Sequence, residues 1–333
     1  MYNRIEMKKF IYILTSISLI LAVLFSSACS HPVSSPNAVP TNRTASPTTI
    51  TTTYQTVLVP TNATSSTTTT IPTNSQNSSN QKPLLEVYFL DVGQGDSEIL
   101  RYGDKTMLID AGTNASTNVL LSDIKSLGIT QFDIVVATHP HEDHIGGLDA
   151  VINNFSIGKL YMPRVTTTTK TFSDVLTAIK NKGYTVTAPV PGSTFNLGDV
   201  QCMVLAPNSQ KYDDLNNYSI VIKVTYGSTS FLFTGDAQTL SEQEMLGKGF
   251  DMKADVLKVG HHGSDSSTSP QFLKAVSPKY GVIEVGKGND YGHPHQITLD
   301  KLAAANVKVY RTDLNGTILF KSDGSAITAS TAR

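Results

Sequence analysis

The spacing of apolar residues changes sharply near residue 84 and stays regular to about residue 322. Short apolar runs separated by glycine and polar turns indicate β-strands, and apolar residues three or four positions apart indicate helices. These patterns predict strands at 84–92, 97–102, 106–109, 132–138, 185–188, 201–205, 219–226, 230–234, 254–259, 280–285, 307–311 and 317–321. They predict helices at 118–127, 145–155, 172–182, 240–246, 270–275 and 297–305.

Strands and helices are interspersed through this region, which predicts one layered α/β domain over residues 84–323. Two sheets with helices on their outer faces would bury both the strands and the apolar stripes of the helices. Residues 324–333 follow the last predicted strand, and we expect them to form a short tail.

Residues 1–29 have the pattern of an export signal. Three basic residues precede an apolar stretch at 10–25, and small residues lead up to Cys29. The run Leu24-Phe-Ser-Ser-Ala-Cys29 resembles the lipidation motif of bacterial lipoproteins, although Ser26 stands where leucine is usual. We expect a lipid on Cys29 and a location on the outer face of the cell membrane. Simple secretion after cleavage at the small residues, and an uncleaved anchor, are the alternatives.

Residues 30–83 are dominated by serine, threonine, proline and asparagine, and no acidic residue occurs between Glu6 and Glu86. A segment of this composition cannot bury a core. It predicts a disordered, extended tether that would hold the following domain away from a surface.

Charge and cysteine content exclude some possibilities. The formal net charge is −1 and 16% of residues are charged, so no overall basic field points to nucleic acid or to an anionic membrane. The two cysteines, Cys29 and Cys202, cannot pair if Cys29 is acylated or removed. Cys202 lies in an apolar run, where we expect a small buried core residue. No protein partner is evident.

The run Thr138-His-Pro-His-Glu-Asp-His-Ile-Gly-Gly147 concentrates metal-binding residue types directly after a predicted strand. It contains the pattern H-x-H-x-D-H, formed by His139, His141, Asp143 and His144. Imidazole and carboxylate together suit zinc or a similar divalent ion, and two ions about 3.5–4 Å apart can share one activated hydroxide. A solvated polar loop also tolerates these residue types, but it has no need of this spacing.

Three further runs place chemically active residues after predicted strands: Thr234-Gly-Asp236, His261-His-Gly-Ser264 and Tyr291-Gly-His-Pro294. Thr-Gly-Asp alone is a weak signal, because Gly-Asp is common in turns. The adjacent histidines are a stronger one. Neighbours on a strand point to opposite sides, so both are not expected to be ordinary core histidines.

These motifs, together with Phe89-Leu-Asp-Val-Gly-Gln-Gly-Asp96, resemble in type and order those of metallo-β-lactamase fold hydrolases, in particular the ComEC-like branch of competence proteins. The resemblance covers residues 84–321. It implies a four-layer αβ/βα sandwich with two divalent metal ions, usually zinc and in some members manganese, where the edges of the two sheets meet. Competence proteins that import DNA add a many-helix membrane channel, which we do not find in this sequence, so we expect a secreted or tethered hydrolase.

The resemblance also implies metal ligands, namely His139 and His141 for the first ion, Asp143 and His144 for the second, Asp236 as a bridge and His261 as a further ligand. Many superfamily members have another histidine before the bridging aspartate, whereas this chain has none between His144 and His261. The first site is then open, or is completed by water or by the region around Asn217, in the run Asn216-Asn-Tyr-Ser219 that matches the branch.

Other residues are expected to act beside the metals. Asp143 would orient the nucleophile, and His262 or His293 would protonate a leaving group. The substrate cleft is expected to be lined by Asp96, Ser97, Asn217 and Ser264. Asp110 is expected to have a structural role.

The implied chemistry is hydrolysis by a hydroxide generated at a dinuclear metal site. We expect a phosphodiester substrate, which could be DNA, a nucleotide or a phosphodiester-bearing envelope polymer. Hydrolysis of a β-lactam or thioester is the enzymatic alternative, and an open first site argues against a lactamase. A non-catalytic surface-binding lipoprotein is the alternative of another class, and the complete H-x-H-x-D-H pattern with Asp236 argues against it.

Overall fold

The computed structural model of the chain describes residues 82–333. The expected export signal, Cys29 and all but the last two residues of the expected tether lie outside this range. Among the described residues, none of the helices is both long and apolar enough to span a membrane.

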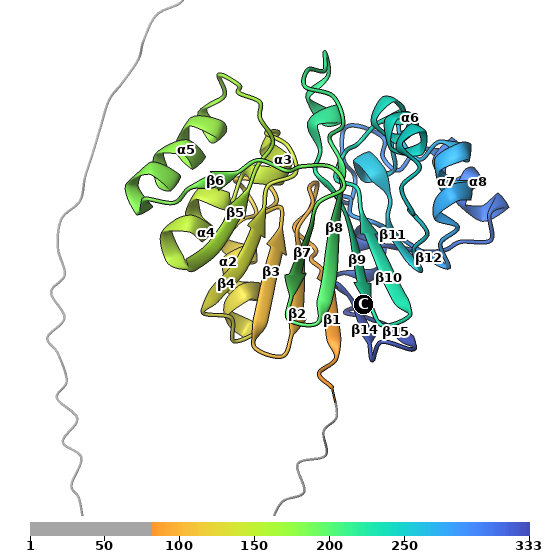
Figure 1. The fold of residues 1–333 in the computed structure, drawn as a ribbon, viewed down its shortest axis with the longest axis horizontal. Helices are drawn as coiled ribbons and strands as arrows, with labels where there is room; N and C mark the ends of the chain where they lie inside the picture. The colour runs from red at the N-terminus through yellow and green to blue at the C-terminus, as the bar shows by residue number, and fades with distance from the viewer. Residues whose placement is uncertain (1–81) are drawn as a thin grey trace, which may run out of the picture. The chain divides into compact units, whose positions relative to one another are not determined.

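The first sheet has eight strands, in the order β15-β14-β1-β2-β3-β4-β5-β6 (Figure 1). Neighbours from β15 to β3 pair antiparallel, and neighbours from β3 to β6 pair parallel. The strands are β1 (Leu85–Phe89), β2 (Glu98–Tyr102), β3 (Lys105–Ile109), β4 (Gln131–Val136), β5 (Ser156–Tyr161), β6 (Val186–Thr187), β14 (Ile318–Ser322) and β15 (Ile327–Thr331).

The second sheet has seven strands, in the order β13-β12-β11-β10-β9-β8-β7. Its strands from β10 to β13 pair parallel, while β7 to β10 pair antiparallel. They are β7 (Thr194–Leu197), β8 (Val200–Ala206), β9 (Val221–Tyr226), β10 (Thr229–Phe233), β11 (Val256–Lys258), β12 (Tyr280–Ile283) and β13 (Lys308–Arg311).

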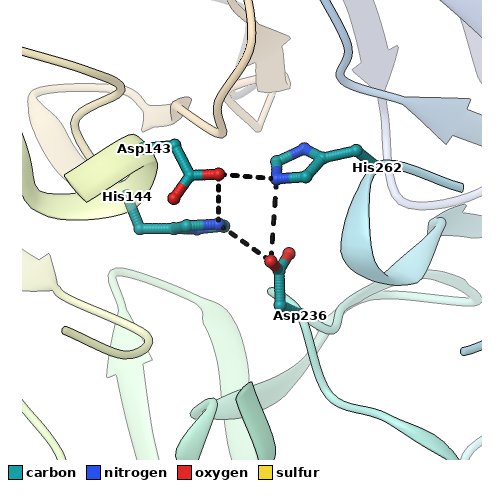
Figure 2. A group of neighbouring side chains, drawn as sticks. All are labelled: Asp143, His144, Asp236 and His262. Carbon is teal, nitrogen blue, oxygen red and sulfur yellow. Dashed lines mark hydrogen bonds and ion pairs between the residues drawn. The ribbon is translucent and has the colours of Figure 1, made fainter. Parts of the chain in front are cut away.

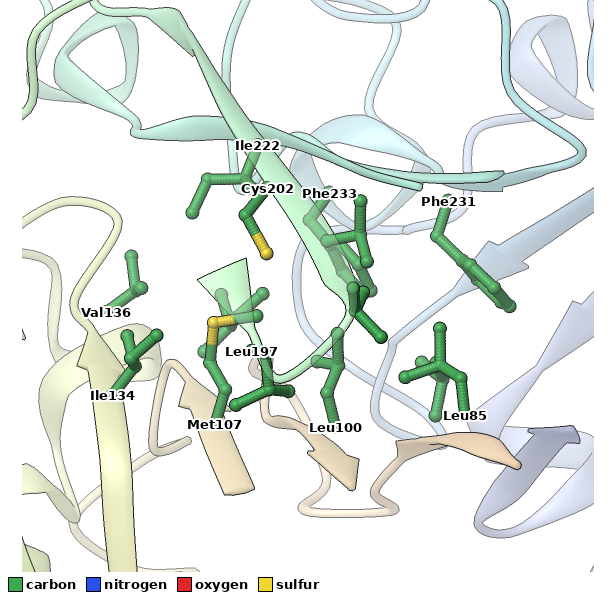
Figure 3. Packing of buried hydrophobic residues seen from close by; sticks show 14 of the residues in the cluster. Leu85, Leu100, Met107, Ile134, Val136, Leu197, Cys202, Ile222, Phe231 and Phe233 are labelled. Atoms are coloured by element: carbon green, nitrogen blue, oxygen red, sulfur yellow. The ribbon is translucent and has the colours of Figure 1, made fainter. Parts of the chain in front are cut away.

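The central core lies between the two sheets (Figure 3). Strand β1 shows how it forms, because alternate residues point to opposite faces of a sheet. Leu85, Val87 and Phe89 join this central core, while Tyr88 joins the apolar cluster on the other face. Cys202 contributes to the central core from the second sheet and is fully buried, as the sequence predicted.

Helices cover the outer faces of both sheets (Figure 1). The first sheet packs against α2 (Thr117–Ser126), α4 (Leu148–Asn154) and α5 (Lys170–Lys182), and the second against α6 (Thr239–Lys248), α7 (Pro270–Val276) and α8 (Gln296–Ala304). Shorter helical segments are α3 (Glu142–Ile145), α9 (Thr312–Asn315), η1 (Leu215–Tyr218) and η2 (Gly260–Gly263). The predicted four-layer αβ/βα sandwich is therefore confirmed.

Three strands, β5, β7 and β15, were not predicted from the sequence. The last of them lies in residues 324–333, where a short tail was expected. Residues 324–333 contain β15, which pairs antiparallel with β14 at the edge of the first sheet. Most residues of β15 are exposed, so its sequence, Ile-Thr-Ala-Ser-Thr, does not need an apolar run and has none. Strands β5 and β7 were missed as well, and both have interrupted apolar patterns.

The helix predicted at 145–155 is two helices, α3 and α4, separated by Gly146 and Gly147. A Cβ atom on Gly146 would lie 2.1 Å from the backbone nitrogen of Asn114, so no larger residue fits. This close approach holds the H-x-H-x-D-H loop against the loop that follows β3.

Candidate metal centre

The predicted motifs lie together at one end of the two sheets. The H-x-H-x-D-H loop follows β4, Thr234-Gly-Asp236 follows β10, η2 follows β11 and the loop with Tyr291 follows β12. All four strands belong to the parallel parts of their sheets. The carboxyl ends of parallel strands meet at one edge, which is where open α/β sheets place their sites.

Asp236 is the centre of this arrangement and is 1% exposed. Four imidazole rings direct Nε2 toward its Oδ2 atom, at distances of 3.3 Å for His144, 3.6 Å for His261, 3.6 Å for His262 and 3.8 Å for His139. A carboxylate surrounded in this way is suited to contact more than one cation.

Asp143, His144, Asp236 and His262 form the tightest group, and Figure 2 shows them converging from α3, the loop after β10 and η2. One ligand atom from each lies within 4.8 Å of the others. Nε2 of His262 is 3.2 Å from Asp143 Oδ2, and Nε2 of His144 is 3.8 Å from the same atom. His144 Nε2 and Asp236 Oδ1 are buried without a hydrogen-bond partner in the structure. A cation placed among these atoms would satisfy them, so the group fits a metal ion.

The other ring nitrogen of each histidine is fixed by an acceptor. His144 Nδ1 lies 2.7 Å from Asp110 Oδ2, and His262 Nδ1 lies 2.9 Å from the carbonyl oxygen of Glu284 and 3.2 Å from Asp96 Oδ1. These partners accept the Nδ1 proton, so that a cation replacing the Nε2 proton would meet a lone pair facing the group, as metal-ligating histidines require.

Asp110 therefore does more than the structural role expected from sequence. Its carboxylate accepts from the backbone nitrogen of Thr138 at 2.7 Å and from the Thr138 hydroxyl at 2.6 Å, which fixes its direction toward His144. Asp110 directly follows β3, just as the predicted metal ligands follow other strands. This position could have identified it as a residue of the site.

The electrostatics of the group attract positive charge. Burial lowers the pKa of His144, but the carboxylates of Asp236, Asp143 and Asp110 outweigh burial and hold that pKa well above its ordinary value. Burial also lowers the pKa of His262, but the carboxylates of Asp236 and Asp96 outweigh burial and raise this pKa to about 10. Burial would raise the pKa of Asp236, but its histidine neighbours, His144 foremost, hold it well below the ordinary value.

His139 adjoins this group, with its ring centroid 4.1 Å from that of His144, and His141 adjoins His139. His139 Nε2 is 3.1 Å from His141 Nδ1. Burial, reinforced by the charge of His144, holds the pKa of His139 well below its ordinary value, so this ring is neutral and suited to be a ligand. Four predicted metal ligands, His139, Asp143, His144 and His261, thus lie around a fifth, Asp236, and the sixth, His141, contacts His139.

The two adjacent histidines differ from expectation in their placement. They do not alternate as neighbours on a strand, because β11 ends at Lys258 and both lie in the turn η2 with left-handed backbone angles, φ 50° for His261 and φ 52° for His262. Both rings therefore face Asp236. His262, which was expected beside the metals, is a member of the tightest group, while His261 lies at its edge with its side chain 22% exposed.

A pocket of about 570 Å³ opens onto this centre. His141, Asp143, Asp236, His261, His262 and His293 all line it, and the remaining walls include Gln94, Thr113, Thr167, Thr169, Asn216 and Tyr291. Burial and the neighbouring His262 lower the pKa of His293 to about 4, so its ring is neutral at physiological pH.

The four residues expected to line the substrate cleft are not among those that line this pocket. Asp96 and Ser97 are 1% and 0% exposed, and they lie beneath the centre: Asp96 pairs with Lys258, and the Ser97 backbone nitrogen donates to Glu284. The amide of Asn217 is bonded to Gln238, and its neighbour Asn216 lines the pocket instead. Ser264 is bonded through its hydroxyl to Ser266. Local sequence could not show which loop residues point inward.

Comparison with known proteins agrees with this geometry. Residues 90–286 match the family model described as metallo-beta-lactamase superfamily. ComE operon protein 3 of Bacillus subtilis is 34% identical over 254 residues, which cover 71% of this chain and 33% of that protein. Competence protein ComA of Neisseria gonorrhoeae is 32% identical over 232 residues, 69% of this chain and 31% of that protein. The chain thus spans about a third of the length of these relatives.

A solved structure shares the fold at low sequence identity. The E377D mutant of the CmlA beta-hydroxylase superposes with a TM-score of 0.50 at 14% identity, over 72% of this chain and 54% of that chain. A hydroxylase on the same fold shows that the fold alone does not determine the reaction.

Proposed function

The chain belongs to the metallo-beta-lactamase superfamily, and on that premise we propose that it is a phosphodiesterase that works with two divalent metal ions, zinc or manganese. The observation that supports this most is the surroundings of Asp236, whose Oδ2 lies 3.3 Å from His144 Nε2, 3.6 Å from His262 Nε2 and 3.8 Å from His139 Nε2. Two divalent ions held by these residues would supply a water of lowered pKa and would stabilise the charge that develops on the oxygens of a phosphodiester under attack.

The pocket is itself acidic, so an anionic substrate would need bound cations there. Its lining contains the carboxylates Glu142, Asp143 and Asp236 and neither lysine nor arginine. A phosphodiester would be repelled from this surface unless metal ions offset the carboxylates. The relatives named for competence are consistent with a phosphodiester substrate.

Individual residues of the chain then have distinct tasks. The side chain of Asp143 is 27% exposed at the pocket, where its carboxylate can accept a hydrogen bond from the attacking water and orient it. Asp110 and the carbonyl of Glu284 hold His144 and His262 in the tautomer that binds a cation. His293 stands at the pocket wall as a neutral ring, where it can hydrogen-bond a substrate oxygen.

The test is turnover by the purified chain loaded with zinc or with manganese. We expect hydrolysis of bis(p-nitrophenyl) phosphate and of single-stranded DNA, and loss of both on treatment with a chelator. Turnover of the β-lactam nitrocefin with no phosphodiester hydrolysis would overturn the proposal. Metal binding without turnover of any of the three would favour a non-catalytic binding protein.

We further propose that the chain acts outside the cell, on the outer face of a membrane, through lipid on Cys29. Its support is the sequence pattern of residues 1–29 alone. Replacing Cys29→Ser should release the protein into the medium or leave the signal uncleaved, with unchanged specific activity. Mass spectrometry of the N-terminal peptide measures the modification directly, and a freely soluble wild-type protein without acyl chains would refute the anchor.

A further inference from the structure

A row of near-parallel rings leads from the metal centre to the mouth of the pocket. The rings of His262 and His293 have centroids 6.2 Å apart and planes 26° apart. The rings of His293 and Tyr291 follow at 5.7 Å and 20°. Tyr291 is 66% exposed, more than the other large apolar side chains found exposed in residues 82–333. The outer end of the row is therefore an aromatic face open to solvent.

The loop that presents Tyr291 is held by one side chain, Asn289. Its Oδ1 accepts from the backbone nitrogens of Tyr291 at 3.1 Å and His293 at 3.0 Å. Its Nδ2 donates to the carbonyl oxygens of His293 at 2.7 Å and Gly286 at 3.0 Å. The backbone that presents the aromatic face is thus held before any ligand binds, which reduces the entropy lost on binding.

We propose that Tyr291 is a stacking subsite for a nucleobase, so that the phosphodiester substrate of this pocket is nucleotide-like. This inference rests on the proposed function, because it places the base at the outer end of the ring row and the phosphodiester at the metal centre. Bases stack on protein aromatic rings regardless of their identity, because every base has a π-face. The pocket of about 570 Å³ that Tyr291 shares with Asp143 and Asp236 can hold a ligand of nucleotide size.

A sugar could also stack on tyrosine, but a sugar site needs hydrogen-bonding side chains directed at the hydroxyl groups. Asn289, the amide of the same loop, uses both ends of its side chain within that loop. The other amides of the pocket lining, Gln94 and Asn216, come from distant segments of the chain. The ring row instead offers consecutive aromatic planes, which match a planar heterocycle. The base is therefore the ligand that these contacts favour.

Two substrates with the same leaving group test the subsite. Thymidine 5′-(p-nitrophenyl phosphate) carries a base, and methyl p-nitrophenyl phosphate does not. We expect wild-type kcat/KM to be roughly 10-fold higher for the thymidine diester, in line with the loss usual when one stacking aromatic is removed. Tyr291→Ala should lower kcat/KM for the thymidine diester far more than for the methyl diester, and Tyr291→Phe should retain the preference.

The outcomes separate the two hypotheses. Turnover of neither diester by the metal-loaded protein overturns the proposed function itself. Turnover of both diesters with Tyr291→Ala lowering them equally, or lowering neither, leaves the phosphodiesterase in place and overturns the subsite. A Tyr291-dependent preference for a hexose 6-(p-nitrophenyl phosphate) over the thymidine diester overturns the assignment to a base in favour of a sugar.

A binding measurement tests the subsite without catalysis. The chain contains no tryptophan, so Tyr291→Trp introduces a single indole fluorophore at the subsite. Thymidine 5′-monophosphate should quench its fluorescence saturably. Leu314→Trp is the matched control, because Leu314 is 59% exposed and lies outside the pocket lining. Equal quenching in both variants would overturn the subsite.

Discussion

The ammonium nitrogen of Lys258 lies 2.7 Å from Asp96 Oδ2, and each of these residues is 1% exposed. Asp96 also contacts Nδ1 of His262, so the pair lies directly beneath the metal centre. Glu98 and Glu284 are buried beside Asp96. Lysine thus supplies the positive charge of a buried acidic cluster, and this cluster supports a histidine of the site.

Lys258→Met should destabilise the protein strongly, because it removes the lysine charge and leaves the buried Asp96 carboxylate with histidine contacts alone. We expect the free energy of unfolding to fall by about 3–5 kcal/mol. Chemical denaturation measures it. The control is Lys279→Met, since Lys279 pairs with Asp255 at 3.0 Å but its side chain is 74% exposed. The Lys279→Met variant should lose less than about 1 kcal/mol of the free energy of unfolding. Equal losses in the two variants would contradict the prediction that burial makes the Lys258 pair more important for stability.

Glu284 should make stability fall with rising pH. Burial and the neighbouring Asp96 raise its pKa from the ordinary 4.5 to about 8. Below pH 4.5 both folded and unfolded chains hold this proton, and between 4.5 and about 8 only the folded chain retains it. Its contribution to the free energy of unfolding is therefore present below 4.5 and is lost as pH rises through this window. Denaturation at several pH values should show a shallower decline for Glu284→Gln, and identical slopes would contradict the prediction.

Asp143→Ala should abolish hydrolysis while leaving the fold intact. This carboxylate faces the pocket, contacts His262 at 3.2 Å and is the candidate to orient the attacking water. We expect a loss of at least about 100-fold in kcat, as for removal of one group that stabilises the transition state. Asp174→Ala is the control, because Asp174 is a residue of α5 whose side chain is 42% exposed and pairs with Lys170. An Asp143→Ala enzyme within a few-fold of wild type would place the chemistry elsewhere.

Elemental analysis of the reconstituted chain should find about two metal ions, because the ligands around Asp236 exceed what one tetrahedral ion accepts. Asp236→Ala should weaken both sites, since its Oδ2 lies 3.3 Å from His144 and 3.8 Å from His139. His139→Ala should reduce the stoichiometry by about one ion and leave the Asp143 group loaded. A wild-type protein without metal after reconstitution would refute the metal centre.

The local sequence pattern was sufficient to predict those helices and strands whose apolar residues are the buried ones. The helix predicted at 172–182 is α5, and it ends where Gly183 adopts φ 70°, a conformation that favours glycine. The strand predicted at 230–234 is β10, whose apolar residues are buried on both faces. Strand β15 was missed because it is a mostly exposed edge strand, so its polar sequence does not show an apolar period.

The sequence by itself determined which residues are available for chemistry. The H-x-H-x-D-H pattern, Asp236 and the histidine pair each follow a predicted strand, and strand ends of one sheet edge lie together in this class of fold. Local spacing was enough for this inference because ligand type and strand position are both local properties.

Only the tertiary structure decided which of those residues contact one another. His262 meets Asp143 across 119 positions of sequence, and Lys258 meets Asp96 from a different sheet. The left-handed turn at His261 and His262 turns both rings inward, which a strand pattern would not allow. These outcomes depend on backbone angles at a single turn and on packing between distant segments, and the order of residues along the chain does not encode either one locally.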